Sequence, residues 1–175
     1  MDFKKLIPDF NAIGKTDWTK PMVNFKEPVS LVSFVGAVLM VILVFVPWIS
    51  LEAAHSGYVC SGSTLGIGTW YGVFAFIMAL LAVAGVLYNH ISVTFCAAVL
   101  GFVFGVIGIS SFPEVEVVTT SPFGLSQAHV VKNAAEWDAA TLGIAMSSYS
   151  RVGVLLYILS TIITAVVSFI KISKK

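Results

Sequence analysis

Four long stretches of the sequence contain almost no polar residue. They cover residues 29–51, 69–88, 91–112 and 152–170, and none of them contains Asp, Glu, Lys or Arg. Each stretch is apolar on all sides rather than at alternate positions, which favours helices over the strands of a membrane barrel. Because a helix needs about 20 apolar residues to cross the hydrocarbon core of a bilayer, the pattern predicts four transmembrane helices.

The predicted fold is therefore all-α. It is a polytopic integral membrane protein whose four-transmembrane-helix bundle occupies residues 29–170. Residues 1–28 precede the bundle, and their prolines exclude one long helix while apolar residues at intervals of three and four favour a segment lying on the membrane surface. A flexible tail is the alternative. Residues 171–175 form a basic tail.

Two connections are long enough to fold outside the membrane. Residues 52–68 form the first outer loop, and the larger second loop, residues 113–150, is expected to be a small extracytoplasmic cap between the third and fourth helices. Within this cap, residues 114–120 alternate like a strand, whereas residues 126–140 are expected to form a short helix.

The composition and the positions of the charges agree with a membrane location. Hydrophobic residues make up 58% of the chain and charged residues 11%. Eight of the ten Lys and Arg residues lie before residue 29 or after residue 170, so the positive-inside rule predicts that both termini are cytoplasmic. Because the sequence has no N-x-S/T site, we expect the inner membrane of a bacterium. A net charge of +1 gives no reason to expect nucleic acid as a partner.

Small residues recur at helical spacing in the second and third stretches. Such stripes allow neighbouring helices to approach closely, either inside one bundle or against another copy or another protein. The predicted helix-packing residues are Gly72, Ala75, Ala79 and Ala82 in the second stretch and Ala97, Gly101, Gly105 and Gly108 in the third.

The sequence contains no constellation of residues typical of catalysis. No Asp, Glu, His, Lys or Arg lies within the four stretches, which argues against proton-coupled transport and against an intramembrane protease with acidic catalytic residues. Cys60 and Cys96 form no C-x-x-C motif and have no histidine at metal-ligand spacing, so neither a metal site nor a cofactor is predicted. Cys60 lies in the first outer loop and is expected to be accessible to reagents from outside.

Two families have a similar arrangement of spans. The membrane oxidoreductases that reoxidise disulfide catalysts are similar in size and topology, but they need paired cysteines in their outer loops, where this chain has Cys60 alone. Claudin-like proteins share the order of the spans and an aromatic residue at the start of the first outer loop, as Trp48 is here. Their first loop is the larger one and carries a cysteine pair, so the chain is assigned to neither family.

The function expected from these observations is non-enzymatic. We expect a structural or accessory subunit that binds another membrane or envelope protein, or further copies of itself, in addition to the lipid bilayer. The residues expected to bind the partner lie in the second outer loop and are Glu114, Glu116, Lys132, Glu136, Trp137 and Asp138. The alternative is a pore or carrier for a small neutral or apolar molecule, lined by the hydroxyl groups of Ser160, Thr164 and Ser168.

Overall fold

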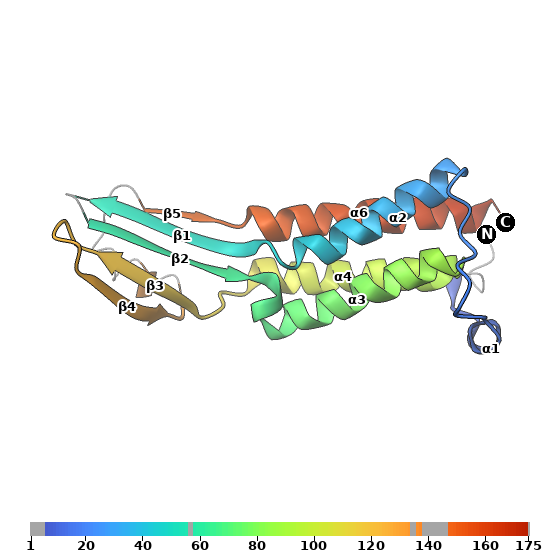
Figure 1. Cartoon of the computed structure of the whole chain (residues 1–175), viewed down its shortest axis with the longest axis horizontal. Helices are drawn as coiled ribbons and strands as arrows, with labels where there is room; N and C mark the ends of the chain where they lie inside the picture. The colour runs from blue at the N-terminus through green and yellow to red at the C-terminus, as the bar shows by residue number, and fades with distance from the viewer. Residues whose placement is uncertain (1–5, 56–57, 134–135, 138–146, 175) are drawn as a thin grey trace.

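The molecule has a helical end and a sheet end. The computed structural model describes residues 6–55, 58–133, 136–137 and 147–174. Helices run side by side through one half of the molecule, and an antiparallel sheet projects from their ends (Figure 1). Both chain ends lie at the far end of the helices, which we call the terminal end, and the opposite end is the sheet end.

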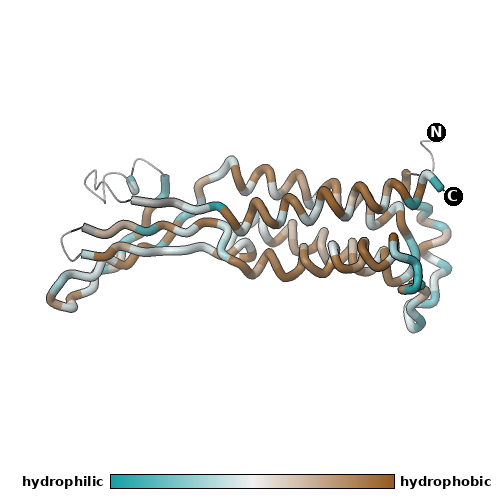
Figure 2. Tube along the Cα trace, turned by 90° about the horizontal axis from the view of Figure 1, so that it is seen from above, coloured by the Kyte–Doolittle hydropathy of each residue, from teal (hydrophilic) through white to brown (hydrophobic). Residues whose placement is uncertain are grey.

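Three of the helices are long and apolar enough to cross a membrane, which indicates a membrane location. They are α3 (Trp70–Leu87), α4 (Ile91–Ser110) and α6 (Val152–Ser173). The helices consist mostly of hydrophobic residues, whereas the sheet and the turns at the terminal end contain more hydrophilic ones (Figure 2). A shorter apolar helix, α2 (Pro28–Leu43), packs against α6 and α3, and the five-residue helix α1 (Phe10–Gly14) lies in the N-terminal segment.

The prediction of an all-α bundle of four transmembrane helices is wrong. Among the described residues, only α3, α4 and α6 reach the length of a membrane span, because α2 has 16 residues. The two connections that were expected to be a loop and a cap instead supply five strands of one sheet. The fold therefore combines a helical part with a sheet, and the sheet accounts for most of what lies beyond the helix ends.

The first apolar stretch changes from helix to strand at Pro47. The residue before a proline is disfavoured in the helical conformation, so α2 ends at Leu43 rather than near Leu51. The indole Nε1 of Trp48 donates a hydrogen bond of 2.9 Å to the carbonyl oxygen of Leu43, which satisfies one of the orphan acceptors at the helix end. From Ile49 onward the side chains alternate between buried and exposed, as in a strand with one covered face.

Both connections between the helices contribute to the same sheet. The first gives β1 (Pro47–His55) and β2 (Tyr58–Leu65), and the second gives β3 (Val115–Thr120), β4 (Ser126–Val131) and β5 (Ser147–Ser150). The strand order is β4-β3-β2-β1-β5, and every neighbouring pair is antiparallel. The long second connection thus encloses the hairpin formed by the first, with β3 on one side of it and β5 on the other.

The second connection confirms one local prediction and contradicts another. The strand expected at residues 114–120 is confirmed as β3. The helix expected at residues 126–140 is wrong where the structure describes it, because Ser126–Val131 forms β4 and pairs with β3. A turn with Gly124 at φ = 79° joins the two strands, and hairpin pairing with β3 outweighs the helix propensity of this short segment.

Aromatic rings fill the space that the small residues leave inside the helical part. All eight predicted helix-packing residues on α3 and α4 are buried. A Cβ atom added at Gly105 would lie 2.7 Å from Cγ1 of Ile158, and one added at Gly108 would lie 2.8 Å from the Trp48 ring. The small-residue faces therefore accommodate bulky side chains of other elements, including Tyr157, whose hydroxyl donates to the carbonyl oxygen of Ala75 at 3.1 Å.

Candidate functional site

The predicted partner-binding residues lie close to the edge of the sheet at β3 and β4. Lys132 and Glu114 form an ion pair of 3.4 Å, with both side chains mostly exposed. The carboxylate of Glu136 accepts hydrogen bonds from the backbone N–H of Lys132 at 2.7 Å and from the side-chain amide of Asn133 at 3.0 Å. These groups form a local polar network after β4. Asp138 lies outside the described residues.

Trp137 does not belong to the exposed part of this region. Its side chain is 3% exposed and packs in a cluster beneath the sheet together with Leu51, Val117 and Val131. Burial of a ring of this size makes Trp137 a core residue of the sheet end. The recognition role expected for it is therefore not compatible with its position in this structure, whereas Glu114, Glu116, Lys132 and Glu136 remain exposed.

The face of the sheet opposite this cluster is open. Glu52, Ser61, Val118 and Ala128 are register partners on four successive strands and are all exposed. The neighbouring Val59 is 52% exposed on the same face. This face therefore carries exposed apolar residues, among them Val59, Val118 and Ala128, interspersed with polar ones such as Glu52 and Ser61.

The β3–β4 turn presents two large apolar side chains, Phe123 and Leu125. Phe123 is 89% exposed and Leu125 is 73% exposed. Figure 1 shows the turn at the far end of the sheet, away from the helices. The bilayer that α3, α4 and α6 are long enough to cross would therefore not cover these side chains, and large apolar groups exposed in this way are typical of interaction sites.

Phe123 and Leu125 were not predicted as site residues from the sequence, because they lie in a connecting segment. A signal is nevertheless present in residues 121–125, where Pro122 and Gly124 are turn residues, Phe123 stands between them and Leu125 follows them. Apolar residues beside turn residues predict an exposed apolar tip, because a turn at the surface has no core to enter.

Strand β4 is an edge of the sheet. Its side chains from Ser126 to Val130 are all exposed, and no described strand pairs with its outer side. Ser121 N donates to Leu125 O at 2.8 Å, and hydrogen-bonded pairs alternate along an antiparallel ladder, so Ala128 directs its N–H and C=O outward. The strand contains neither Lys nor Pro, the residues that commonly protect such an edge.

The hydroxyl groups proposed for a pore lie between helices. Ser160 Oγ donates to the carbonyl oxygen of Gly36 at 2.8 Å, and Thr164 Oγ1 donates to the carbonyl oxygen of Ser160 at 2.9 Å. Ser168 is also fully buried. These residues line the contact between α6 and α2, where close packing at Gly36 leaves no room for a Cβ atom.

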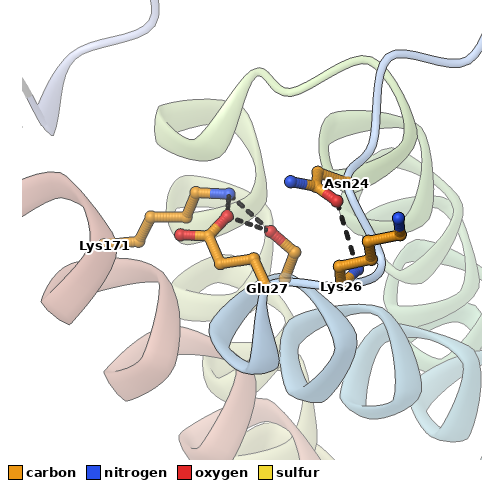
Figure 3. Close-up of polar contacts among 5 residues, drawn as sticks. Asn24, Lys26, Glu27 and Lys171 are labelled. Carbon is orange, nitrogen blue, oxygen red and sulfur yellow. Dashed lines mark hydrogen bonds and ion pairs between the residues drawn. The ribbon is translucent and has the colours of Figure 1, made fainter.

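A charged cluster joins α2 and α6 at the terminal end (Figure 3). Lys171 Nζ lies 2.8 Å from Glu27 Oε2 and 2.6 Å from Ser30 Oγ, and Ser30 Oγ donates to Glu27 Oε2 at 2.7 Å. The Lys171 side chain is 10% exposed and that of Glu27 is 42% exposed. Glu27 precedes the first turn of α2 and Lys171 lies in the last turn of α6, so each charge also interacts favourably with its helix dipole.

Comparisons with known proteins supply no assignment. In the part of the chain that the structure describes, no three His, Cys, Asp or Glu residues are grouped closely enough to hold a metal ion. Comparison of the chain with protein-family models, with curated proteins and with solved structures found no match.

Proposed function

We propose that this chain is a non-enzymatic membrane protein whose sheet binds an extended segment of another membrane or envelope protein. The observation that carries the proposal is the exposed β4 edge beside the apolar tip formed by Phe123 and Leu125. An added strand pairs with the free N–H and C=O groups of an edge, and alternate side chains confer specificity. Pairing with a second copy of the chain through β4 would be a variant of the same mode.

The proposed orientation places the sheet outside the cytoplasm and both termini inside. Five lysines precede α2 and three lie at or beyond the last turn of α6, whereas Lys132 and Arg151 lie toward the sheet end. This distribution supports a multi-pass location in the cell membrane, and we propose the bacterial inner membrane. An accessory subunit oriented in this way would present its binding edge to partners outside the cytoplasm.

The pore alternative has less support. A conducting path needs polar groups that replace the water around its cargo along most of the bilayer. The Ser160 hydroxyl instead donates to a carbonyl of α2 and the Thr164 hydroxyl to a carbonyl of its own helix, whereas the buried Ser168 hydroxyl has no hydrogen-bond partner among the described residues. Ser160 is therefore better explained as an interhelical hydrogen-bonding group, and Thr164 and Ser168 as small buried residues that allow α2 and α6 to pack closely.

Substitution at Ala128 tests strand addition directly. Ala128→Pro removes an outward-facing N–H without removing a bond of the β3–β4 ladder, so the sheet should remain intact while an added strand loses a hydrogen bond. Ala128→Thr is the matched control, because it keeps the N–H group and suits a strand. A second variant, Phe123→Ser with Leu125→Ser, removes the apolar tip.

The measurement is quantitative co-purification from native membranes. We expect one defined protein, or the chain itself, to be recovered with the parent and with Ala128→Thr, and to be lost with Ala128→Pro and with the tip variant. Replacing Ser160, Thr164 and Ser168 by Ala should leave the association intact. The proposal is wrong if recovery is the same for all folded variants. It should give way to the pore if reconstituted vesicles show a flux that the α6 substitutions abolish.

A further inference from the structure

The N-terminal strap, residues 6–27, lies across the turn between α3 and α4. Its backbone N–H at Met22 donates to the carbonyl oxygen of Leu87 at 2.8 Å, and Thr16 Oγ1 lies 2.6 Å from Nε2 of His90. Nearer the start of the strap, the Cys96 thiol donates to the carbonyl oxygen of Leu6 at 3.5 Å. These contacts are spread along the strap, so it is fixed to the helices rather than joined to them at one point.

An aromatic contact also fixes the middle of the strap to the α3–α4 turn. The rings of Trp18 and Tyr88 meet edge to face with centroids 4.6 Å apart, and the Tyr88 hydroxyl donates to the carbonyl oxygen of Trp18. Trp18 also faces His90 at 6.2 Å. Although the strap contacts the α3–α4 turn, part of it is separated from the sides of α3 and α4 by a space.

A cavity of about 410 Å³ lies between the strap and these two helices. Phe10 and Trp18 line it from the strap, Leu81 and Ala84 from α3, and Cys96 from α4. The surface that the cavity presents is entirely apolar. Its volume falls within the range of about 300–1,000 Å³ found for small-molecule sites.

A second cavity, of about 290 Å³, adjoins the first. The two share Pro8, Ile13, His90 and Val93, but the second also reaches polar groups, among them Asp9 and Asn89. His90 therefore stands between an apolar compartment and one with polar residues. This arrangement matches a molecule that has an apolar chain and a polar head.

The occupant follows from what surrounds the apolar cavity. Cavities lined by apolar groups do not retain water, but they bind apolar molecules of suitable size. Leu81 and Leu100, which line the cavity, are 44% and 48% exposed on helices long enough to cross a membrane. The cavity therefore lies next to the bilayer, whose acyl chains are both apolar and abundant.

We propose that the strap and the α3–α4 turn bind one membrane lipid, with a single acyl chain in the apolar cavity and the polar head beside His90. The described strap carries Lys15, Lys20 and Lys26 but also Asp9, Asp17 and Glu27, so its charge selects no particular headgroup. The site therefore recognises the acyl chain of the lipid rather than its headgroup. The site lies at the end of the molecule opposite the sheet and is independent of the proposed partner-binding edge.

Photocrosslinking tests the site in the full chain. The protein is reconstituted into phosphatidylcholine nanodiscs that contain a small fraction of phosphatidylcholine with a diazirine at the middle of one acyl chain. After illumination, crosslinks should concentrate in the strap and in the parts of α3 and α4 that line the cavity. An even distribution over all exposed helix faces would show bulk lipid contact only, and would overturn the proposal.

A filling substitution and its control sharpen the result. Ala84→Phe places a ring in the cavity and should reduce the crosslinks there several-fold. Val73→Phe is the matched control, because Val73 is 42% exposed on the same helix but does not line the cavity. Equal crosslinking of the strap region in both variants would contradict the proposal.

Labelling of Cys96 provides a second readout that needs no substitution in the cavity. An apolar maleimide should react with Cys96 after lipid has been removed with detergent, and added phosphatidylcholine should restore protection. Cys60, which is buried at the sheet end, is the internal reference. If lipid changes the reactivity of neither thiol, or of both equally, the cavity does not hold an acyl chain.

Discussion

The ion pair between Lys171 and Glu27 should be one of the stronger polar links between helices in this molecule. At 2.8 Å and an effective dielectric constant of about 20, the attraction between the two charges is about 6 kcal/mol. Desolvation of the nearly buried Lys171 offsets several kcal/mol of this. The net contribution should then lie between that of an exposed pair, about 0–1 kcal/mol, and the 3–5 kcal/mol lost when a fully buried pair is broken.

The expected cost of Glu27→Gln is therefore about 1–3 kcal/mol of unfolding free energy, because the ammonium group of Lys171 loses its counter-charge in a mostly buried position. Lys171→Met removes the buried charge as well as the pair and should cost less. The double variant should recover part of the loss caused by Glu27→Gln, because no unpaired charge remains.

A double-mutant cycle measures this coupling. The parent, both single variants and the double variant are unfolded in the same detergent, and the change in unfolding free energy is compared. The exposed pair between Lys132 and Glu114 is the internal control, with an expected coupling of no more than about 0.5–1 kcal/mol. If the two cycles give equal couplings, burial of Lys171 does not strengthen its pair and the reasoning is refuted.

Three further predictions concern packing. Gly105→Ala should lower the unfolding free energy by about 1–2 kcal/mol, because the new methyl group collides with Ile158. Thermal unfolding measures this loss, and an unchanged stability would mean that the helices separate freely at this point. Trp137→Ala should lower the unfolding free energy by about 3–5 kcal/mol, because the ring is buried at the sheet end. It should also weaken the near-ultraviolet circular dichroism of the protein, and an unchanged spectrum would place the ring outside the core. Cys60 is 6% exposed and accepts a hydrogen bond from Thr119, so a membrane-impermeant maleimide should label it only slowly, and rapid labelling of the folded protein would contradict its burial.

The slow labelling expected for Cys60 reverses what its position in a loop suggested. In the sequence, residues 52–68 contain small and polar residues and no long apolar run. The alternation that buries Leu51, Ala53 and Cys60 on one face becomes evident only once β1 and β2 are paired. The burial of Cys60 thus depends on the pairing of the strands, which its immediate sequence neighbours do not specify.

The helices were easier to predict than the sheet for a physical reason. A helix satisfies its backbone hydrogen bonds within one continuous segment, so a run such as Trp70–Leu87 is recognisable by itself. A strand depends on its partners, which here come from two connections separated by α3 and α4. Ser126–Val131 was expected to be helical because its pairing with β3 is not specified by its own composition. Trp137 was expected at the surface because the cluster that buries it includes residues of both connections.

The candidate site was predicted only in its general location. The second connection was expected to bind the partner, and its residues Glu114 and Lys132 are exposed in the structure. The apolar tip and the open edge depend on the order of the strands, which places β4 at the outside of the sheet. Nothing in the local composition of β4 specifies that order.

The junctions between helices and strands give the sheet mechanical leverage. Three residues separate α2 from β1, and only Arg151 separates β5 from α6. With about 3.3 Å per residue, the nine residues of β1 reach about 30 Å from the helix ends, so that a tilt of about 10° would displace the far end by about 5 Å. A pull on the sheet would reach α2 through β1 and α6 through β5, and the Glu27–Lys171 ion pair joins those two helices at their opposite ends.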